Sequence, residues 1–513
     1  MRRIRMRLAV LVGFGCGLAS LGCSNLADDC DKTLTCSGNS AGDASTGGGS
    51  GDAGTGGSGG ASGTGGSSGS SGSGGNDGST CDPTKSPSED GCVIDEQYGV
   101  FVDSGSTAGT PDGTRANPYK TITDAIGAAA GKRIYVCNTN DPYKESLSIG
   151  ASADGIALYG GFDCTANTWT YGTNKANVSG GTTAVTIDGL TKGVHFEDFS
   201  ISSADAAQPG ESSVAIFAKS SANIEMIRVD ITAGKGMKGA DGVLNSYTYP
   251  TAATLKGKDA SGLSGGGLTS FSCAAGDQTI GGRGGDAPTA ENGNPGLPAL
   301  GAGQAGTVGS CGATGTGKDG APGASATDAA GAVTLGTLSS TGWSAASGAD
   351  GTAGGVGQGG GGGASDTTGG GGGGGAGACG GAGGTGGKGG GASIAVLLLD
   401  TTITLDASVK LTTSGAGDGG KGAAAQAGQT AGGFGGVQSA GGCSGGKGAA
   451  GGNGAAGGGA AGGVSAAVAW KGSTAPTINT TNITLGAKGN KGLGGKPGTN
   501  DGIDGVSVDV LAL

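Results

Sequence analysis

Three stretches far apart in the chain share one pattern of short strands and decide the fold: SVAIFAKSSANIEMIRVDITAGKG (213–236), SIAVLLLDTTITLDASVKLTTSGAG (393–417) and SAAVAWKGSTAPTINTTNITLGAKG (465–489). Two sets of apolar residues align in them without a gap: Ile216 with Val396 and Val468, and Ile231 with Leu411 and Ile483. Each copy holds apolar strands joined by a polar bend. Such repeats stack equivalent strands side by side, so the sequence predicts a β-solenoid.

Short alternating strands also precede these copies. In GVHFEDFSI (193–201), Val194 and Phe196 share one phase of the alternation, whereas Phe199 and Ile201 share the other. The change of phase at the intervening Glu-Asp pair predicts a corner, where the chain turns from one face of the solenoid to the next.

One segment near residue 122 has helical rather than strand periodicity. Its apolar residues fall on one helical face: Ile122, Ala125, Ile126 and Ala129. Pro118 lies shortly before this segment, where its missing N–H costs little. We therefore expect a short helix over 122–130, between strands at 100–102 and 134–137.

Glycine-rich tracts follow the repeated strands. Glycine accounts for 127 of 513 residues but proline for only 13, so collagen throughout the chain is excluded. Four tracts leave the strands: 234–330, 348–391, 414–463 and 486–505. Residues 331–351 resemble a shortened copy of the repeat, and GVSVDVLAL (505–513) is expected to form a last strand.

The last tract contains GAKGNKGLGGKPG (486–498), with glycine at every third position. Five triplets are too few for a collagen segment, which also needs three chains in register. A three-residue period equally describes a single extended helix of the polyproline-II type. We hypothesise that these tracts run side by side as polyglycine-II-type helices bonded to their neighbours, with Lys488, Lys491 and Lys496 pointing outward.

The N-terminus carries an export signal. The basic MRRIRMR is followed by LAVLVGFGCGLASLG (8–22), an apolar run too short to span a bilayer comfortably. We expect residues 1–22 to be a lipoprotein signal peptide that leaves Cys23 as the lipidated residue. Ser24 after it favours the outer membrane. The alternative is ordinary secretion with Cys23 free or in a disulfide. Residues 23–80 are expected to form a flexible tether rich in glycine and serine.

Cysteine usage agrees with export. Of 12 cysteines, Cys16 leaves with the signal and Cys23 takes lipid, so an even number remains for disulfides. The candidates are Cys30, Cys36, Cys81, Cys92, Cys137, Cys164, Cys273, Cys311, Cys379 and Cys443. Sequential pairing is only one of many possible connectivities; it would include Cys273 with Cys311 and Cys379 with Cys443. A zinc site is disfavoured, because the chain has no CxxC motif and one histidine.

A family resemblance rests on four stretches: YGVFVDSGSTAGTPDGTRANPYKTITDAI (98–126), RIYVC (133–137), YKESLSI (143–149) and GIALYGGFDC (155–164). They resemble the pectin-lyase-like right-handed parallel β-helix proteins of myxobacteria and relatives, in which the Asn-Pro-Tyr-Lys-Thr-Ile stretch begins a capping helix. The glycine-rich continuation looks like PGRS family proteins. The resemblance implies an all-β fold with a right-handed parallel β-helix over 81–233, glycine-rich repeats with interspersed β rungs over 234–513, and a surface location. It supplies no catalytic residues.

Candidate chemistry is sparse. His195 and Glu197 lie opposite Val194 and Phe196 and should face outward; with Asp188 and Asp198 they are the nearest approach to a glycosidase carboxylate pair. The competing and favoured interpretation is a solvated strand face. No P-loop motif occurs. The matches to G-x-S-x-G all fall within the glycine-rich tether and tracts, so none marks a nucleophile elbow, and GGRGGDAP (281–288) is a single near-match to a calcium nonapeptide. We expect no metal and no cofactor.

Composition and anchor together suggest a function. The net charge of −11 argues against nucleic acid binding. We expect an exported, lipid-anchored structural or adhesive protein of the outer membrane or cell surface, without catalytic activity. Its partners would be the membrane, through the lipid, and a polysaccharide, matrix or neighbouring cell. The alternative is a polysaccharide lyase or glycoside hydrolase that uses the β-helix groove. A narrower idea, binding of ice by flat glycine-rich faces, rests on architectural analogy alone.

Overall fold

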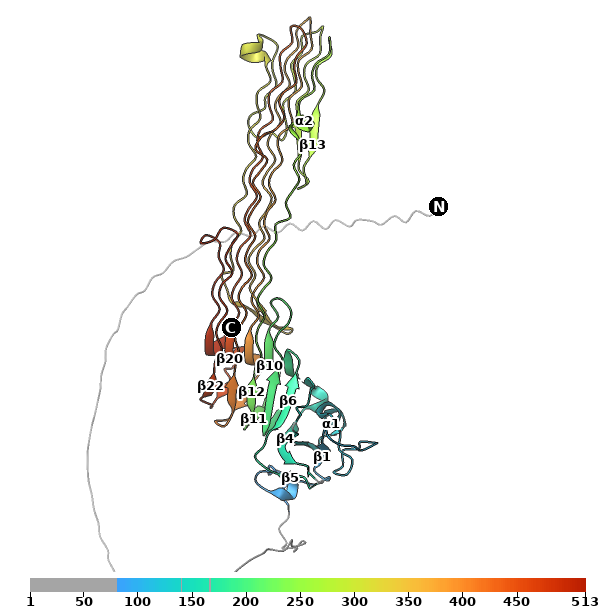
Figure 1. The fold of residues 1–513 in the computed structure, drawn as a ribbon, viewed down its shortest axis with the longest axis vertical. Helices are drawn as coiled ribbons and strands as arrows, with labels where there is room; N and C mark the ends of the chain where they lie inside the picture. The colour runs from blue at the N-terminus through green and yellow to red at the C-terminus, as the bar shows by residue number, and fades with distance from the viewer. Residues whose placement is uncertain (1–80, 140, 166–167) are drawn as a thin grey trace, which may run out of the picture. The chain divides into compact units, whose positions relative to one another are not determined.

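The computed structural model describes residues 81–139, 141–165 and 168–513. The predicted signal peptide, the lipidation site Cys23, the tether and the pair Cys30 and Cys36 lie outside these residues. The described part is all-β, and three parallel sheets contain all of its strands except those of two hairpins; these sheets lie in the lower part of Figure 1. No helix among the described residues is long and apolar enough to cross a membrane.

Each of the three sheets collects strands from distant parts of the chain. Sheet A contains β1 (Gly99–Val102), β2 (Arg133–Cys137), β4 (Ile156–Asp163), β8 (Val194–Glu197), β11 (Ile224–Ile227), β18 (Ile403–Leu405) and β21 (Thr477–Ile478), with β5 (Thr170–Tyr171) antiparallel beside β4. Sheet B contains β6 (Ala176–Gly180), β9 (Phe199–Ser203), β12 (Asp230–Thr232), β19 (Lys410–Thr412) and β22 (Asn482–Thr484). Sheet C contains β3 (Leu147–Ile149), β7 (Thr183–Asp188), β10 (Ser213–Lys219), β17 (Ser393–Leu399), β20 (Ser465–Lys471) and β23 (Ser507–Ala512).

The chain visits the sheets in a fixed order. From β4 onward it passes from sheet A to sheet B to sheet C and back, and we call one such passage a coil. This parallel arrangement is compatible with a β-helix. The sequence repeat is confirmed in register, because Ile216 pairs with Val396 and Val396 with Val468 on sheet C. The predicted last strand is β23, beside β20.

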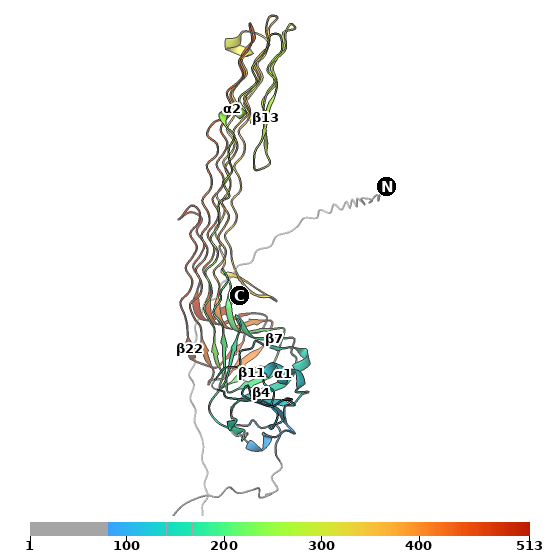
Figure 2. The ribbon, with the colours of Figure 1, turned by 45° about the vertical axis from the view of Figure 1, so that its right-hand side comes forward.

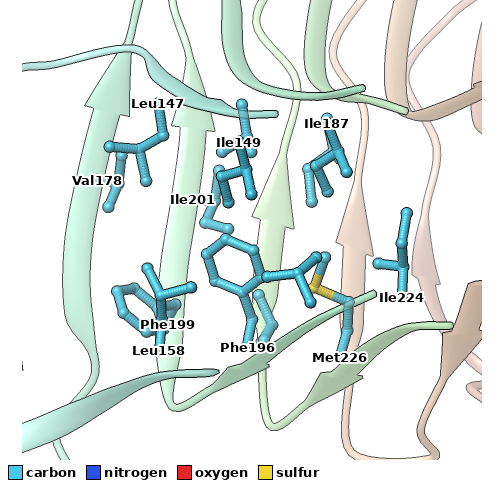
Figure 3. Packing of buried hydrophobic residues seen from close by; sticks show 14 of the residues in the cluster. Leu147, Ile149, Leu158, Val178, Ile187, Phe196, Phe199, Ile201, Ile224 and Met226 are labelled. Carbon is cyan, nitrogen blue, oxygen red and sulfur yellow. The ribbon is translucent and has the colours of Figure 1, made fainter. Parts of the chain in front are cut away.

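The three sheets enclose the hydrophobic core (Figure 3). Val178 and Ile201 enter it from sheet B, Ile149 and Ile187 from sheet C, and Phe196 from sheet A. At its first end lies the predicted helix, α1 (Ile122–Ala128), which begins at Thr121, whose side chain accepts a hydrogen bond from the Asp124 N–H. Its buried residues Ile122 and Ala125 belong to the same core. The helix therefore covers apolar side chains that the first coil would leave open.

The corner predicted within residues 193–201 is present. Strand β8 lies in sheet A and β9 in sheet B, and between them Asp198 has a φ of 61°. One coil later, Arg228 has a φ of 52° between β11 and β12. A left-handed conformation at a residue other than glycine is uncommon and is maintained here by side-chain contacts described below.

Three long insertions leave the coils at one junction, between sheet B and sheet C. They comprise residues 233–392, 413–464 and 485–506, and we call them together the glycine-rich array. Serine side chains close this junction. The Ser213 hydroxyl lies 2.8 Å from that of Ser203, and the Ser465 hydroxyl 2.7 Å from that of Thr413. In these two copies the first serine thus binds the strand end from which the chain departs, whereas the Ser393 hydroxyl accepts from the Ser414 N–H of the next coil at 2.9 Å.

Within the array, extended segments run side by side (Figures 1 and 2) and are joined by backbone hydrogen bonds at three-residue intervals. The N–H groups of Gly381, Gly384 and Gly387 donate to carbonyls 452, 455 and 458. The segment 443–463 also donates to segments 346–364 and 417–436, and it accepts from 317–332. Each central segment is thus bonded in several directions, and the hypothesis that the tracts lie side by side is confirmed.

Glycine is required where segments touch. A Cβ atom on Gly452 would lie 2.0 Å from the carbonyl oxygen of Ala324, far inside van der Waals contact. In the triplet stretch 486–498, a Cβ on Gly489 would meet the Gly417 oxygen at 2.0 Å, and one on Gly492 the Gly420 oxygen at 1.9 Å. The first four triplet glycines therefore line a contact with a neighbouring segment, whereas nothing lies within 4 Å of a Cβ position on Gly498. The lysines between them point outward as expected.

Aspartates repeat along the edges of the array. The Asp241 carboxylate accepts from the Lys421 N–H (2.8 Å), while the N–H of the next residue, Gly242, donates back to the Lys421 carbonyl (2.6 Å). The same reciprocal pair occurs at further sites: Asp205, Asp259, Asp319, Asp328 and Asp418. An Asp followed by Gly or Ala thus fixes the register of two parallel segments.

The shortened repeat copy expected at 331–351 is wrong. Strands β15 (Gly336–Ser339) and β16 (Gly342–Ala345) of this region form an antiparallel hairpin outside the three sheets. Leu338 and Trp343 of this hairpin pack against the outer face of sheet C. The apolar residues of 331–351 therefore belong to a second hydrophobic cluster, outside the core. Because no strand of the three sheets lies between β12 and β17, the first two predicted tracts form a single insertion. A second hairpin, β13 (Thr269–Ser272) with β14 (Gln278–Gly281), and the one-turn helix α2 (Ala252–Leu255) decorate the same insertion.

Four disulfides cross-link the described residues. Cys81–Cys92 and Cys137–Cys164 are sequential pairs, as one connectivity suggested. Sequential pairing is wrong within the array, where Cys273 pairs with Cys379 and Cys311 with Cys443. The reason is which segments become neighbours. The segment after Cys273 runs antiparallel beside the segment before Cys379, where the Gly374 N–H donates to the Gly282 carbonyl, and the segment after Cys311 runs parallel beside the segment after Cys443, where the Gly317 N–H donates to the Ser444 carbonyl. Four disulfides are consistent with an exported protein.

Close contact at individual glycines can be tested by two neighbouring substitutions. Gly417→Ala places a methyl group 2.1 Å from the Met237 carbonyl oxygen, and we expect it to lower the free energy of unfolding by about 1–3 kcal/mol. Gly415→Ala is the control, because nothing lies within 4 Å of its Cβ position. The control should be neutral or stabilising by up to about 1 kcal/mol. Equal effects in chemical denaturation of the two variants would contradict this packing.

Candidate functional site

The polar cluster at the corner between sheets A and B gathers most of the residues that the sequence marked as candidates. His195 and Glu197 lie on the outer face of β8, and Asp198 forms the corner itself. Arg228 occupies the equivalent corner of the next coil. We call this group the corner cluster: His195, Glu197, Asp198, Arg228, Glu225 and Tyr171.

Arg228 joins the two carboxylates. Its Nε donates to Asp198 Oδ1 at 2.8 Å and its Nη2 to Asp198 Oδ2 at 3.0 Å. The same Nη2 also donates to Glu197 Oε1 and, at 3.0 Å, to the Tyr171 hydroxyl. The Tyr171 hydroxyl in turn donates to Asp198 Oδ2. A planar guanidinium suits such a forked arrangement, and these contacts hold both corner residues in their left-handed conformation.

His195 extends the cluster along sheet A. Its Nε2 lies 3.1 Å from Glu197 Oε2 and its Nδ1 lies 3.0 Å from Glu225 Oε2 on the adjacent strand β11. The ring also packs against that of Tyr159 of β4, with 5.3 Å between the centroids and a tilt of 43° between the ring planes. The histidine therefore bridges two carboxylates and contacts strands on both sides of its own.

The expectation of a solvated strand face is wrong for the two carboxylates. Glu197 and Asp198 are each only 2% exposed. The segment that begins at Cys81 contributes to this burial, since the Ser88 hydroxyl donates to Glu197 Oε1 at 2.8 Å. Arg133 anchors that segment through Nη1 to the Lys85 carbonyl at 2.6 Å. A long-range contact of this kind leaves no mark in the alternation of a single strand.

An open groove of about 520 Å³ borders the cluster. It lies between the N-terminal segment, including Ser86 and Glu89, and the outer face of sheet A, including Tyr159 and Glu225. On the first coils, this outer face is occupied by a third apolar cluster: Phe101, Tyr135, Tyr159, Phe162 and Trp169. The groove is thus a short polar space next to this aromatic cluster, and Tyr159 belongs to both.

The cluster favours the charged forms of His195, Glu197 and Arg228 and the neutral form of Tyr171. Burial by itself would raise the pKa of Glu197, but hydrogen bonds from His195 and Ser88 and the charge of Arg228 outweigh it, and the pKa is lowered. Burial likewise opposes protonation of His195, yet its bonds to Glu197 and Glu225 leave its pKa raised. The hydrogen bond to Asp198 is the main reason that the pKa of Arg228 is raised. Burial, followed by the Asp198 carboxylate, raises the pKa of Tyr171 to about 12.

These shifts bear on glycoside hydrolysis. A glycosidase acid must be a carboxyl group that stays protonated near neutral pH, which requires a raised pKa. The pKa of Glu197 is shifted in the opposite direction, and Asp198 is bound at both oxygens. Asp188 is separate from the cluster, at the end of β7, where it pairs with Lys219 at 3.2 Å. The arrangement is that of a structural ion-pair network. Among the described residues, no group of three or more potential ligand side chains could hold a metal ion.

Sequence reasoning missed Arg228 and Tyr171. A usable signal exists for Arg228, because β8 and β11 pair Val194 with Ile224 and Glu197 with Ile227, which places Arg228 opposite Asp198. Aligning consecutive coils, rather than reading each strand alone, would have revealed opposite charges at one corner. No comparable signal exists for Tyr171, which reaches the cluster from the short antiparallel strand β5.

Removal of the arginine should destabilise the coils. In Arg228→Gln, two buried carboxylates lose their shared cation, and we expect the free energy of unfolding to fall by about 2–3 kcal/mol. This expected loss is smaller than the loss caused by breaking a fully buried ion pair, because the Arg228 side chain is 38% exposed. Lys85→Gln is the control, since its 3.5 Å pair with Glu89 is exposed and should contribute less than about 1 kcal/mol. A cost for Arg228→Gln no larger than the control's would refute the structural role.

His195 should make stability depend on pH. Because its folded-state pKa is raised, the stabilisation is complete below its ordinary pKa and is lost as the pH rises through the raised value. Wild type and His195→Gln should therefore be compared by urea unfolding from about pH 5.5 to about pH 8.5. We expect the advantage of the wild type to shrink toward high pH. An advantage that stays constant or grows over this interval would show that the imidazolium is not the stabilised form.

The corner cluster thus consists of groups bound to one another, although His195, Glu197, Glu225 and Arg228 also line the open groove. Comparisons of the chain with protein-family models, with curated proteins and with solved structures found no match. The functional interpretation therefore depends on the chain's own sequence and geometry.

Proposed function

We propose that this chain is an exported, lipid-anchored structural or adhesive protein of the cell surface, without catalytic activity. The observation that carries the proposal is the glycine-rich array. Three insertions, separated in sequence by coils, form one body through backbone hydrogen bonds. A body of this kind presents a regular external surface and contains little side-chain chemistry, which suits contact with matrix or another cell better than catalysis.

The detailed fold is part of this proposal. The order of sheets A, B and C from β4 to β23 supports a right-handed parallel β-helix with α1 as its cap, as the resemblance to pectin-lyase-like proteins implies. Hydrogen bonds at every third residue and close backbone contacts at glycine support polyglycine-II helices in the array. The PGRS-like, myxobacterial type of lipoprotein remains the family that we propose.

Export and anchoring are supported by separate features. The four disulfides suggest an extracellular or exported location. The N-terminal sequence, with Cys23 after an apolar run, favours lipid attachment, and Ser24 favours the outer membrane. The alternative, a polysaccharide lyase or hydrolase, is less well supported because the pKa of Glu197 is lowered, the opposite of what a glycosidase acid requires.

Lipid anchoring can be tested in cells that express the full chain. Cys23→Ser should abolish incorporation of labelled palmitate and release the protein from the membrane fraction, whereas Cys16→Ser should do neither. Cells carrying the anchored protein should adhere to matrix more than cells carrying Cys23→Ser. Equal labelling of both variants would exclude Cys23 as the lipid site. Equal adhesion, or release of sugars from a polysaccharide panel by purified protein, would refute the adhesive role.

A further inference from the structure

The outer face of sheet B carries two straight columns of polar side chains. Strand pairing places one column in register across all five strands: Ser179, Ser202, Thr232, Thr412 and Thr484. A second column lies two residues earlier: Asn177, Ser200, Asp230, Lys410 and Asn482. Neighbouring strands lie ~4.8 Å apart and alternate residues ~6.7 Å apart, so the two columns form a regular polar lattice.

This face is accessible and firmly supported from behind. The residues that alternate with the columns, including Val178, Ile201, Ile231 and Leu411, are buried in the core. All column residues are partly or fully exposed. At the end nearest α1, the lattice opens into a groove of about 400 Å³ lined by Asn138, Asn174, Asn177 and Ser200 among others.

Hydroxyl and amide groups dominate the lattice, and its charges offset one another. Asp230 lies 2.6 Å from the Lys175 ammonium and 3.9 Å from that of Lys410. One net positive charge remains, on a chain whose overall charge is −11. The outer face of sheet B is thus much closer to neutral than the acidic composition of the whole chain would suggest. A nearly neutral face disfavours a strongly charged ligand of either sign.

The hydroxyl column retains most of its bonding capacity. The Ser202 hydroxyl donates to the Val178 carbonyl at 3.2 Å. In the described part of the chain, the hydroxyls of Thr232, Thr412 and Thr484 make no hydrogen bond to another residue. A hydroxyl can both donate and accept, so three adjacent strands offer free groups of both kinds to a ligand.

We propose that the outer face of sheet B binds an uncharged polysaccharide that lies along the hydroxyl column, across the strands. This inference rests on the proposed adhesive function and names its ligand class and site. The ~4.8 Å repeat is comparable to the length of one sugar ring in an extended chain, so each strand would meet one sugar unit. A neutral polymer of hydroxyl groups complements a lattice of hydroxyls and amides, and a rigid flat face limits the entropy lost on binding.

The position of the face fits this role. Thr232, Thr412 and Thr484 are the last residues of β12, β19 and β22, directly before the three insertions begin. A bound chain would therefore lie along the base of the glycine-rich array, where three consecutive coils supply equivalent contacts. Because each contact is weak, binding should depend on ligand length, with hexamers bound more tightly than dimers.

The test uses the full exported chain and two probes, cellohexaose and chitohexaose, in calorimetric titrations. Thr232→Val with Thr412→Val removes two hydroxyls but retains β-branched side chains of similar volume, so folding should survive. We expect binding of at least one hexamer by the wild type, and affinity weaker by roughly tenfold or more in the double variant. Thr404→Val on sheet A is the matched control and should bind as the wild type does.

Each outcome decides the proposal. Failure of the wild type to bind both hexamers overturns it, and so does unchanged affinity in the double variant when its thermal unfolding matches the control's. Binding lost equally in Thr404→Val overturns the assignment to sheet B. If cells still adhere to matrix while the hexamers do not bind, the adhesive function stands and only this site and ligand class fail.

Discussion

Backbone hydrogen bonds between segments that approach at glycine are the constraint on which the rest of the structure depends. In the array, N–H and C=O groups find partners on neighbouring segments at three-residue intervals, in several directions at once. This is possible only where segments approach too closely for a Cβ atom, as at Gly452. Ordering glycine costs conformational entropy. The net stabilisation from the hydrogen bonds between segments, which replace hydrogen bonds to water, offsets this cost together with two disulfides. The coils supply what the array lacks, a hydrophobic core that fixes where each segment begins and ends.

The repeat and the corner could be predicted from sequence because both are local alternation patterns aligned at constant spacing. Ile216, Val396 and Val468 occupy equivalent places because every coil must present an apolar side chain to the same core. The hairpin at 336–345 could not be distinguished from a coil, since apolar alternation does not say which of two clusters a strand covers. The disulfide pairs of the array were equally hidden, because they depend on which segments become neighbours.

In the corner cluster, too, local sequence patterns predict only part of the arrangement. Alternation correctly places His195 and Glu197 on the outer face of β8, but whether that face meets water depends on a segment about a hundred residues earlier, through Ser88. The acidic residues of the chain likewise have a role that the sequence alone did not reveal. Many aspartates, such as Asp241, accept backbone N–H groups of neighbouring segments, so they contribute to register as well as to solubility.

The three-residue spacing of the bonds has a consequence for how such a chain changes length. Lengthening an antiparallel pair of segments by three residues on each side preserves every existing contact, whereas adding one residue to one side shifts all later donors away from their acceptors. The spacing of partners differs at some places: Thr385 and Ala376, nine residues apart, donate to Val243 and Leu255, which are twelve apart. At another place, Gly448 and Gly451, three residues apart, donate to Gly433 and Gln429, which are four apart. The array can absorb a single unmatched residue there. Along the regular stretches, we expect duplication and loss of sequence to be tolerated only in whole triplets, so the reach of this surface should vary in steps rather than continuously.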